Sequence, residues 1–595
     1  MKVSIPESVK SIGFSSFEYC SLLFEINIPS SVITIGSGAF CDCTSLKQLV
    51  IPSSVSTIKS KAFRNCVSLK SISIEGSLVL IDDSTFHNCR SLSKISFKQP
   101  MSILNIYDQA FSGCLSLKQI DIPPSVKSIG TFAFYNCSSL EQIEIPSSVV
   151  SINSYAFSNC TSLKKVILPS KLVLIDENAF KNCESLKSIE IPSSVESIGN
   201  LAFYKCISLT NISIPSTITY IGYESFFGCS SLSQIQFFNN NHDNERLSFS
   251  EEISNISSSN KIRERAFARC SSLKEITIPP LINLINYEAF KECTSLTQIT
   301  LNFGIISIGM SILKECSSLK KIIMSPLIKT IESDSFYKCS SLSEIEMPLI
   351  VTSIGCNAFL ECSSLKKISL PSVTHIGDGA FRDCSSLEEI MSTEKIKYID
   401  SDAFRNCSSI KQISIPSVIN IKENAFSGCH SLKEITIPSS LLKMGNSAFF
   451  GCYSLEKVSL HASIVYLQPF SFYRCSSLKE ISIPDSVTSI ENYAFSECSS
   501  LVSITLPPYL TYIGKNAFCG CSSLPEIIIP SLVRTIDEEA FKRCSSLVEI
   551  EIPFSVTAIN ANAFEKCFSL KRIAIPSSIN YKNIGIGQNV SIDLF

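Results

Sequence analysis

Residues Leu140 to Cys160 read LEQIEIPSSVVSINSYAFSNC, and this stretch decides the fold. Ile143 and Ile145 stand two residues apart, as in a strand with one buried face. Pro146 has no backbone N–H and therefore ends the strand. The next residues turn the chain, and Ile152 returns an apolar side chain to the interior. The stretch predicts one β-strand, a turn and a second inward contact.

The end of the same stretch, Ala156 to Cys160, carries apolar residues at helical offsets. Phe157 and Cys160 are three residues apart, so both side chains can point inward from one helical or 3₁₀ turn. We therefore expect a short helical turn on the side of the unit that lies opposite the strand.

One cysteine marks this position in 24 successive units of the chain. The spacing is 22 or 23 residues, except for 25 residues before Cys114 and 41 before Cys270. Phe fills the slot three residues earlier in 23 of the 24 units, and Leu313 fills the remaining one. A single unit cannot bury both its strand face and its Phe, so the units must stack on one another. Stacked repeats of this kind form a solenoid.

These features predict an α/β repeat solenoid, namely a curved superhelix of leucine-rich repeats. We expect a parallel sheet on its concave side and short helical or 3₁₀ turns on its convex side. The expected parts are repeats 1–10 over 1–237, a polar inserted loop over 238–260, repeats 11–24 over 261–580, and an irregular C-terminal end over 581–595. All changes of unit length fall between strand and turn, where surface chain tolerates insertions.

Composition excludes several classes of function. The chain has 595 residues, of which 45% are hydrophobic and 17% are charged, and a net charge of −2, so no basic field favours nucleic acid. No secretory signal and no apolar run long enough to span a membrane are visible. The histidines are scattered over different units and positions, which disfavours a catalytic set: His87, His242, His375, His430 and His461. We predict a protein that is not an enzyme and has no cofactor.

The cysteines invite two other interpretations, a disulfide ladder and a metal site. Each ladder cysteine occupies the same inward slot beside a Phe, where a free thiol packs as a small hydrophobe. Parallel stacking rarely gives the Cβ orientation that a disulfide needs. The C-x-C pairs Cys41–Cys43 and Cys519–Cys521 lack the further ligands that zinc requires. We expect reduced, buried thiols and a structural ladder that includes Phe134, Cys137, Phe157, Cys160, Phe495 and Cys498.

The outward side chains of the strands are the candidate binding face. They are polar, mixed in sign and almost free of the aromatic residues that usually anchor a tight interface. A broad surface with weak individual contacts fits this composition; the alternative is that these residues only keep a long sheet soluble. The candidate residues are Lys118, Gln119, Asp121, Glu141, Gln142, Glu144, Lys164, Lys165, Lys366, Lys367, Glu388 and Glu389.

Three further features bear on partners. Tyr135, Tyr204, Tyr337 and Tyr473 follow the ladder Phe and either pack between units or form a convex stripe. Among the N-x-S/T sequons, only Asn255, in the insertion, is expected to be accessible. The chain starts inside a strand without a polar capping unit, and such an open edge invites self-association.

The segments IPDSVTSI at 483–490 and AFSECSSL at 494–501 resemble the repeat of the BspA-like leucine-rich-repeat surface antigens. The likeness covers essentially the whole chain. Such proteins occur in oral bacteria and in parasitic protists, and the residue usage here is more similar to the protists. The resemblance implies a surface antigen or adhesin that binds host proteins, cells or matrix, and it implies no catalytic residues. The missing export signal leaves an intracellular interaction scaffold in the cytoplasm as the alternative.

Overall fold

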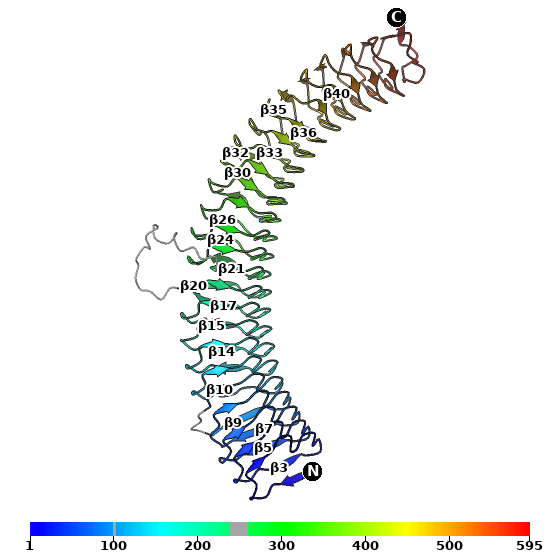
Figure 1. The fold of residues 1–595 in the computed structure, drawn as a ribbon. Coiled ribbons are helices and arrows are strands. Elements are labelled where there is room, and N and C mark those ends of the chain that lie inside the picture. The colour runs from blue at the N-terminus through cyan, green and yellow to red at the C-terminus, as the bar shows by residue number, and fades with distance from the viewer. Residues whose placement is uncertain (99–102, 239–259) are drawn as a thin grey trace. The chain divides into compact units, whose positions relative to one another are not determined.

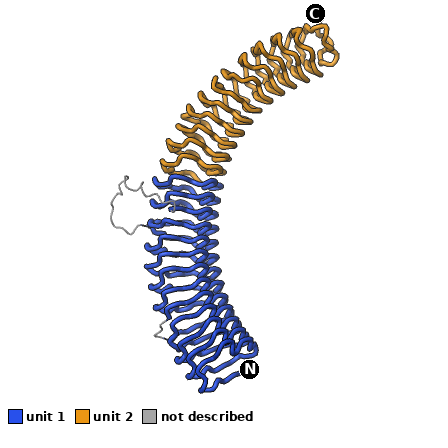
Figure 2. The backbone as a smooth tube through the Cα atoms, viewed as in Figure 1, with its two compact units in different colours: residues 1–316 blue, residues 317–595 orange. Residues whose placement is uncertain are grey.

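The computed structural model describes residues 1–98, 103–238 and 260–595. The chain divides into an N-terminal unit, 1–316, and a C-terminal unit, 317–595 (Figures 1 and 2). Each unit is a stack of similar coils. A coil usually contains a face strand, which follows the recurring leucine, and a two-residue return strand, which ends in the next inward isoleucine or its equivalent. The segments 118–122, 411–415 and 526–529 stand in the place of a face strand but are not strands. The predicted loop lies, except for its end residues, outside the described residues.

The N-terminal unit contributes two columns of strands. Its face strands are β1 (Lys2–Ser4), β3 (Glu25–Asn27), β5 (Gln48–Ile51), β7 (Ser71–Ile74), β9 (Lys94–Phe97), β12 (Gln142–Glu144), β14 (Lys165–Ile167), β16 (Ser188–Glu190), β18 (Asn211–Pro215), β20 (Gln234–Phe238), β22 (Glu275–Thr277) and β24 (Gln298–Thr300). Its return strands are β2 (Ser11–Ile12), β4 (Thr34–Ile35), β6 (Thr57–Ile58), β8 (Leu80–Ile81), β10 (Asn105–Ile106), β11 (Ser128–Ile129), β13 (Ser151–Ile152), β15 (Leu174–Ile175), β17 (Ser197–Ile198), β19 (Tyr220–Ile221), β21 (Lys261–Ile262), β23 (Leu284–Ile285) and β25 (Ser307–Ile308).

The C-terminal unit repeats this plan. Its face strands are β26 (Lys321–Ile323), β28 (Glu344–Ile345), β30 (Lys367–Ser369), β32 (Glu389–Met391), β35 (Glu434–Ile437), β37 (Lys457–Leu460), β39 (Glu480–Ser482), β41 (Ser503–Thr505), β44 (Glu549–Glu551), β46 (Arg572–Ile575) and β47 (Ser591–Leu594). Its return strands are β27 (Thr330–Ile331), β29 (Ser353–Ile354), β31 (His375–Ile376), β33 (Tyr398–Ile399), β34 (Asn420–Ile421), β36 (Lys443–Met444), β38 (Tyr466–Leu467), β40 (Ser489–Ile490), β42 (Tyr512–Ile513), β43 (Thr535–Ile536) and β45 (Ala558–Ile559).

The parallel stacking that the repeat predicts is confirmed, but the longest sheet is formed by the return strands. In the N-terminal unit these strands make one ten-stranded parallel sheet from β8 to β25, in which Ile152 pairs with Ile129 and Ile175. The face strands instead form short sheets, such as β12 with β14 and β16 with β18 and β20. The return sheet also passes the insertion without a change of register, because Ile221 of β19 pairs with Ile262 of β21.

The prediction of helical turns is wrong. Among the described residues every assigned element is a strand, and the stretch from Asn153 to Cys160 consists of hydrogen-bonded turns. The N–H groups of Tyr155, Phe157 and Asn159 donate to carbonyls of the next coil, at 2.8–3.0 Å. The N–H groups of the alternate residues, Ala156, Ser158 and Cys160, donate to the carbonyl three residues back in their own coil.

After the first turn of a helix, successive N–H groups all bond within their own segment, so this alternation excludes a helix. Tyr155 and Asn159 also adopt positive φ values of 58° and 62°, which interrupt a right-handed helix. The same segment nevertheless points its apolar residues inward, as the pattern predicts.

The core of each unit is a continuous file of Phe rings. Phe157 is fully buried, and its ring centroid lies 5.3 Å from that of Phe134 and 5.4 Å from that of Phe180, with nearly parallel planes. Phe226 and Phe267 continue the file on either side of the insertion, with their centroids 5.1 Å apart. Each ring is thus buried by the coils on both sides of it, which is why one coil alone could not fold.

The segment 581–595, expected to be irregular, contains the strand β47. This strand pairs in parallel with β46, and Ile592 lies opposite Ile573. The chain therefore extends the face sheet of the C-terminal unit by one more strand.

Candidate functional site

The candidate face consists of the outward side chains of the face strands and the segments aligned with them. Along β12, Ile143 points into the core while Gln142 and Glu144 point to solvent, because successive side chains of a strand alternate between its two faces. All the candidate residues named from the sequence are exposed in the structure. They fall into one group in the N-terminal unit and one in the C-terminal unit.

The N-terminal group surrounds a shallow hollow of about 510 Å³, here called the N-terminal hollow. Five of the candidate residues line it, together with apolar and small side chains. The lining residues are Gln119, Ile120, Asp121, Ile122, Pro124, Gln142, Ile143, Glu144, Pro146, Ser147, Lys165 and Ile167.

The hollow lies where the face sheet is interrupted. The segment 118–122 is aligned with β12 but is not a strand, and the sheet that contains β12 consists of β12 and β14. The exposed Ile167 adds an apolar side chain, while Asp121 and Glu144 add carboxylates. This arrangement can bind a ligand that carries both apolar and basic groups.

Three charged residues form the rim of the N-terminal hollow, because each directly precedes a lining residue in the sequence. They are Lys118, Glu141 and Lys164. The Nζ atom of Lys164 lies 3.0 Å from Oε2 of Glu141 on the preceding coil. This hydrogen bond lowers the pKa of the Glu141 carboxyl. The pair is fully exposed, so it aligns neighbouring coils and contributes little to stability.

The C-terminal group, Lys366, Lys367, Glu388 and Glu389, forms ion pairs across coils. The Nζ of Lys367 lies 3.5 Å from Glu389, and the Nζ of Lys411 lies 3.0 Å from Glu388. Lys366 lines a more open hollow together with Lys320 and the serines of neighbouring coils. The sequence did not single out Lys320 or Lys411, although both occupy the strand position of Lys366 in their own coils.

The Phe and Cys side chains of the structural ladder are buried, except in the first unit, where Phe17 and Cys20 are half-buried. Phe134, Phe157, Phe495 and the cysteines that follow them are at 0% exposure. The thiol of Cys160 donates to the carbonyl oxygen of Phe134 at 3.2 Å, and Cys498 contacts Phe472 in the same way at 3.2 Å. Burial raises the pKa of the Cys137 thiol to about 12, so it stays a neutral hydrogen-bond donor.

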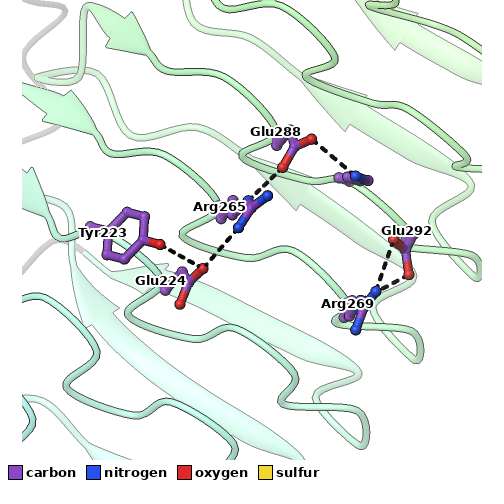
Figure 3. A network of polar contacts seen from close by, with 7 residues as sticks. Tyr223, Glu224, Arg265, Arg269, Glu288 and Glu292 are labelled. Carbon is purple, nitrogen blue, oxygen red and sulfur yellow. Dashed lines mark hydrogen bonds and ion pairs between the residues drawn. The ribbon is translucent and has the colours of Figure 1, made fainter.

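A polar network that the sequence did not reveal joins the coils on either side of the insertion (Figure 3). Nη1 of Arg265 lies 3.3 Å from Glu224, which precedes the insertion, and Nε lies 2.5 Å from Glu288 on the next coil. Tyr223 donates to Glu224 at 2.9 Å, and Lys291 contacts Glu288 at 2.9 Å.

Burial alone would raise the pKa of Glu288, but its hydrogen bonds with Lys291 and Arg265 hold the pKa below its ordinary value. The network therefore fastens three successive coils. Its only sequence signal is the run Arg263-Glu264-Arg265, which replaces the usual residues of that turn.

Two of the tyrosines that follow the ladder Phe pack between coils. Tyr204 stacks on Phe227 with centroids 5.3 Å apart, and Tyr473 stacks on Phe450 at 5.1 Å. Tyr135 instead meets Phe132 of its own coil edge to face at 5.4 Å. Of the two interpretations that the sequence left open, packing between coils therefore describes Tyr204 and Tyr473.

Further titratable groups link neighbouring coils. His375 Nε2 and Lys422 Nζ both contact the carboxylate of Asp400, at 3.1 and 2.8 Å, and so link coils. Within 1–98, 103–238 and 260–595, no three His, Cys, Asp or Glu side chains gather closely enough to hold a metal ion. In the same residues no helix is long and apolar enough to cross a membrane.

The sequons have different surroundings. Asn255 lies outside the described residues, so its predicted access stays a prediction. Among the described residues, four sequon asparagines are exposed, so the expectation that only Asn255 is accessible is wrong: these are Asn136, Asn211, Asn406 and Asn589.

The fold and its exposed face define a class: a non-helical parallel β-solenoid of stacked leucine-rich coils with a polar strand face. A family model described as the BspA type leucine-rich repeat region matches residues 1–105, 96–203, 151–260, 260–388, 329–420, 352–479 and 465–587. These matches span almost all of the sequence. The chain therefore belongs to the BspA-type leucine-rich-repeat family.

Several solved structures are similar to the chain. A leucine-rich repeat protein from Bacteroides ovatus is 23% identical, with a TM-score of 0.34, over 83% of this chain and 92% of that one. A leucine-rich cell surface protein from Faecalibacterium prausnitzii is 28% identical, with a TM-score of 0.34, over 61% and 86%. The pneumococcal vaccine antigen PcpA is 18% identical, with a TM-score of 0.27, over 70% and 86%. A comparison with curated proteins finds no match.

Proposed function

We propose that this chain is a non-enzymatic protein-binding module that acts at a cell surface as an antigen or adhesin and attaches to host proteins, matrix or cells. The observation that carries the proposal is the N-terminal hollow, because it places Gln119, Asp121, Gln142, Glu144 and Lys165 around one concavity beside an exposed isoleucine. A source among parasitic protists, drawn from residue usage, is part of the same proposal.

The character of the face supports binding through many weak contacts. Some of its charges are paired between neighbouring coils, as in Glu141 with Lys164, and a paired charge anchors a partner less strongly than an isolated one. Repetition along the stack offers several similar contact points, and these raise the overall affinity when a partner engages more than one of them.

Attachment is the direct test. Beads coated with the full chain are expected to bind host cells or immobilised matrix proteins, and the double variant Gln142→Ala with Glu144→Ala is expected to reduce this binding. The matched control is Ser188→Ala with Glu190→Ala in β16, which changes the same two strand positions outside the hollow. Equal loss in both variants, or no binding by the parent chain, would contradict the proposal.

The second candidate is an intracellular interaction scaffold, favoured by buried thiols that fit a reducing compartment. Antibody staining of intact and permeabilised cells separates the two candidates. Staining of intact cells supports the surface role, whereas signal that needs permeabilisation supports the scaffold.

Self-association through β1 is a further part of the proposal. β1 pairs with β3 on one side, and Phe14, Tyr19 and Leu22 of the same coil are exposed. Sedimentation velocity over a range of concentrations tests it: a sedimentation coefficient that does not rise with concentration rejects this contact.

A further inference from the structure

A further hollow, of about 410 Å³, lies on the face of the C-terminal unit beside β44 and is here called the C-terminal hollow. It is formed by the segment 526–529, by β44 and by the start of β46. Its lining residues are Glu526, Ile527, Ile528, Ile529, Glu549, Ile550, Glu551, Pro553 and Arg572. The segment 526–529 contacts β44 through a single bridge between Glu526 and Glu549, so the face sheet is interrupted here as well.

An exposed apolar patch marks this hollow. Ile528 is 84% exposed, although isoleucine is usually buried. Val502, Pro525 and Val548 occupy one outward strand position in three successive coils, and all three are exposed. Exposed apolar patches rimmed by polar groups commonly mark contacts with other proteins.

The rim of the C-terminal hollow is predominantly negative. Glu526, Glu549 and Glu551 line it, and Arg572 is its one lining cation. Arg572 is already engaged, because its Nε lies 2.6 Å from Asp593 and its Nη1 lies 3.7 Å from Glu549. The lining carboxylates therefore outnumber the lining cations, and a partner that covers Ile528 would place its own side chains beside this excess negative charge.

The N-terminal hollow has the same ingredients at the same outward strand positions. Ile167 corresponds to Ile528, and Glu144 corresponds to Glu551. Each hollow also contains a single lining cation, Lys165 in one and Arg572 in the other. The glutamate precedes the isoleucine in the N-terminal hollow, whereas the isoleucine precedes the glutamate in the C-terminal hollow. The two hollows therefore contain similar residue types but no common sequence motif.

We propose that the C-terminal hollow is a second docking site, and that both hollows bind an extended, basic segment of a partner protein with an apolar side chain beside its lysines or arginines. The inference rests on the proposed function, since it takes the N-terminal hollow as the first site. The apolar side chain packs on Ile528 or Ile167, and the basic side chains lie over the lining carboxylates, which are glutamates in the C-terminal hollow and Asp121 and Glu144 in the N-terminal hollow.

The spacing of the face supports an extended segment as the occupant. Glu526 and Ile528 are two residues apart, so in an extended chain their side chains lie roughly 6.6 Å apart on one face. Alternate side chains of an extended peptide have the same separation. One basic and one apolar side chain from such a peptide therefore reach Glu526 and Ile528 together.

Calorimetric titration of the full chain with a synthetic peptide tests the inference. The probe is a short blocked peptide in which lysine and valine alternate with serine, and the control peptide has glutamate in place of lysine. We expect two molecules of the lysine peptide to bind per chain, more weakly as salt rises, and the glutamate peptide not to bind.

Matched variants assign the sites. Ile528→Ser, or Glu526→Gln with Glu551→Gln, is expected to remove one equivalent, and Ile167→Ser with Glu144→Gln the other. Ile323→Ser is the control, because Ile323 is exposed at the same strand position but lines neither of these two hollows. These substitutions replace solvent-facing side chains, so an unchanged melting temperature shows that a loss of binding is local.

The possible outcomes separate the two proposals. One equivalent that disappears only in the N-terminal variants overturns the second site and leaves the proposed function intact. Equal binding of the glutamate peptide, or no binding of the lysine peptide, overturns the ligand class in both hollows, while the bead assay still decides the proposed function.

Discussion

Replacement of one ladder phenylalanine should loosen a few coils and leave the rest of the stack intact. The ring of Phe157 is fully buried and stacks on rings at 5.3 and 5.4 Å on either side. A Phe side chain removes about 150–250 Å² from water. At about 25 cal/mol per Å², burial of this ring stabilises the folded state by about 4–6 kcal/mol. The Cβ atom of an alanine retains part of this stabilisation. We therefore expect Phe157→Ala to cost about 4 kcal/mol, within the usual range for core Phe-to-Ala changes.

Hydrogen exchange measures this loss coil by coil. Each coil contacts only its neighbours, so amides near Phe134, Phe157 and Phe180 should exchange up to about a thousandfold faster, whereas those near Phe40 should not change. Phe157→Leu is the matched control, because Leu313 shows that leucine fits this slot; its cost should be about 1 kcal/mol. Equal exchange in the alanine and leucine variants, or acceleration that extends to Phe40, would refute the reasoning.

Two further predictions concern thiols and acid. In the native chain Cys356 is exposed and should react with a thiol reagent at mildly alkaline pH. Cys137 and Cys160 should react only after unfolding, because burial raises the pKa of both thiols. Rapid labelling of the ladder cysteines in native conditions would contradict this. The pKa of Glu288 is lowered in the folded chain, so its contribution to stability is present above its ordinary pKa of 4.5 and is lost as the pH falls through the lower folded value. Circular dichroism during acid titration should show less acid sensitivity in Glu288→Gln than in the parent chain, and identical titration curves would argue against the network.

The candidate face was predictable residue by residue, but the hollows in it were not. Period-two alternation places Gln142 and Glu144 outward on any strand of this repeat, and the structure exposes both. Whether neighbouring strands stay in one sheet depends on contacts between coils. Residues 118–122 and 526–529 resemble the other face segments in sequence, yet they are not strands, and a hollow lies beside each.

The network around Arg265 was missed for a related reason. Glu224 and Arg265 are 41 residues apart, so no helical or strand period connects them. They meet because β19 and β21 pair across the insertion and place their coils side by side. Only the unusual run of charges at 263–265 distinguishes this place in the sequence.

The repeat pattern is sufficient to predict that the chain is a stack of coils and which side chains point inward. The recurring Ile, Phe and Cys positions cannot be buried within one unit, and burial of apolar surface therefore dictates stacking. The conformation of the turn that carries Phe157, by contrast, depends on contacts between coils. Its apolar spacing suits a helix, but its alternate N–H groups bond to the neighbouring coil. Those acceptors do not exist until the next coil is in place, so local periodicity could not reveal them.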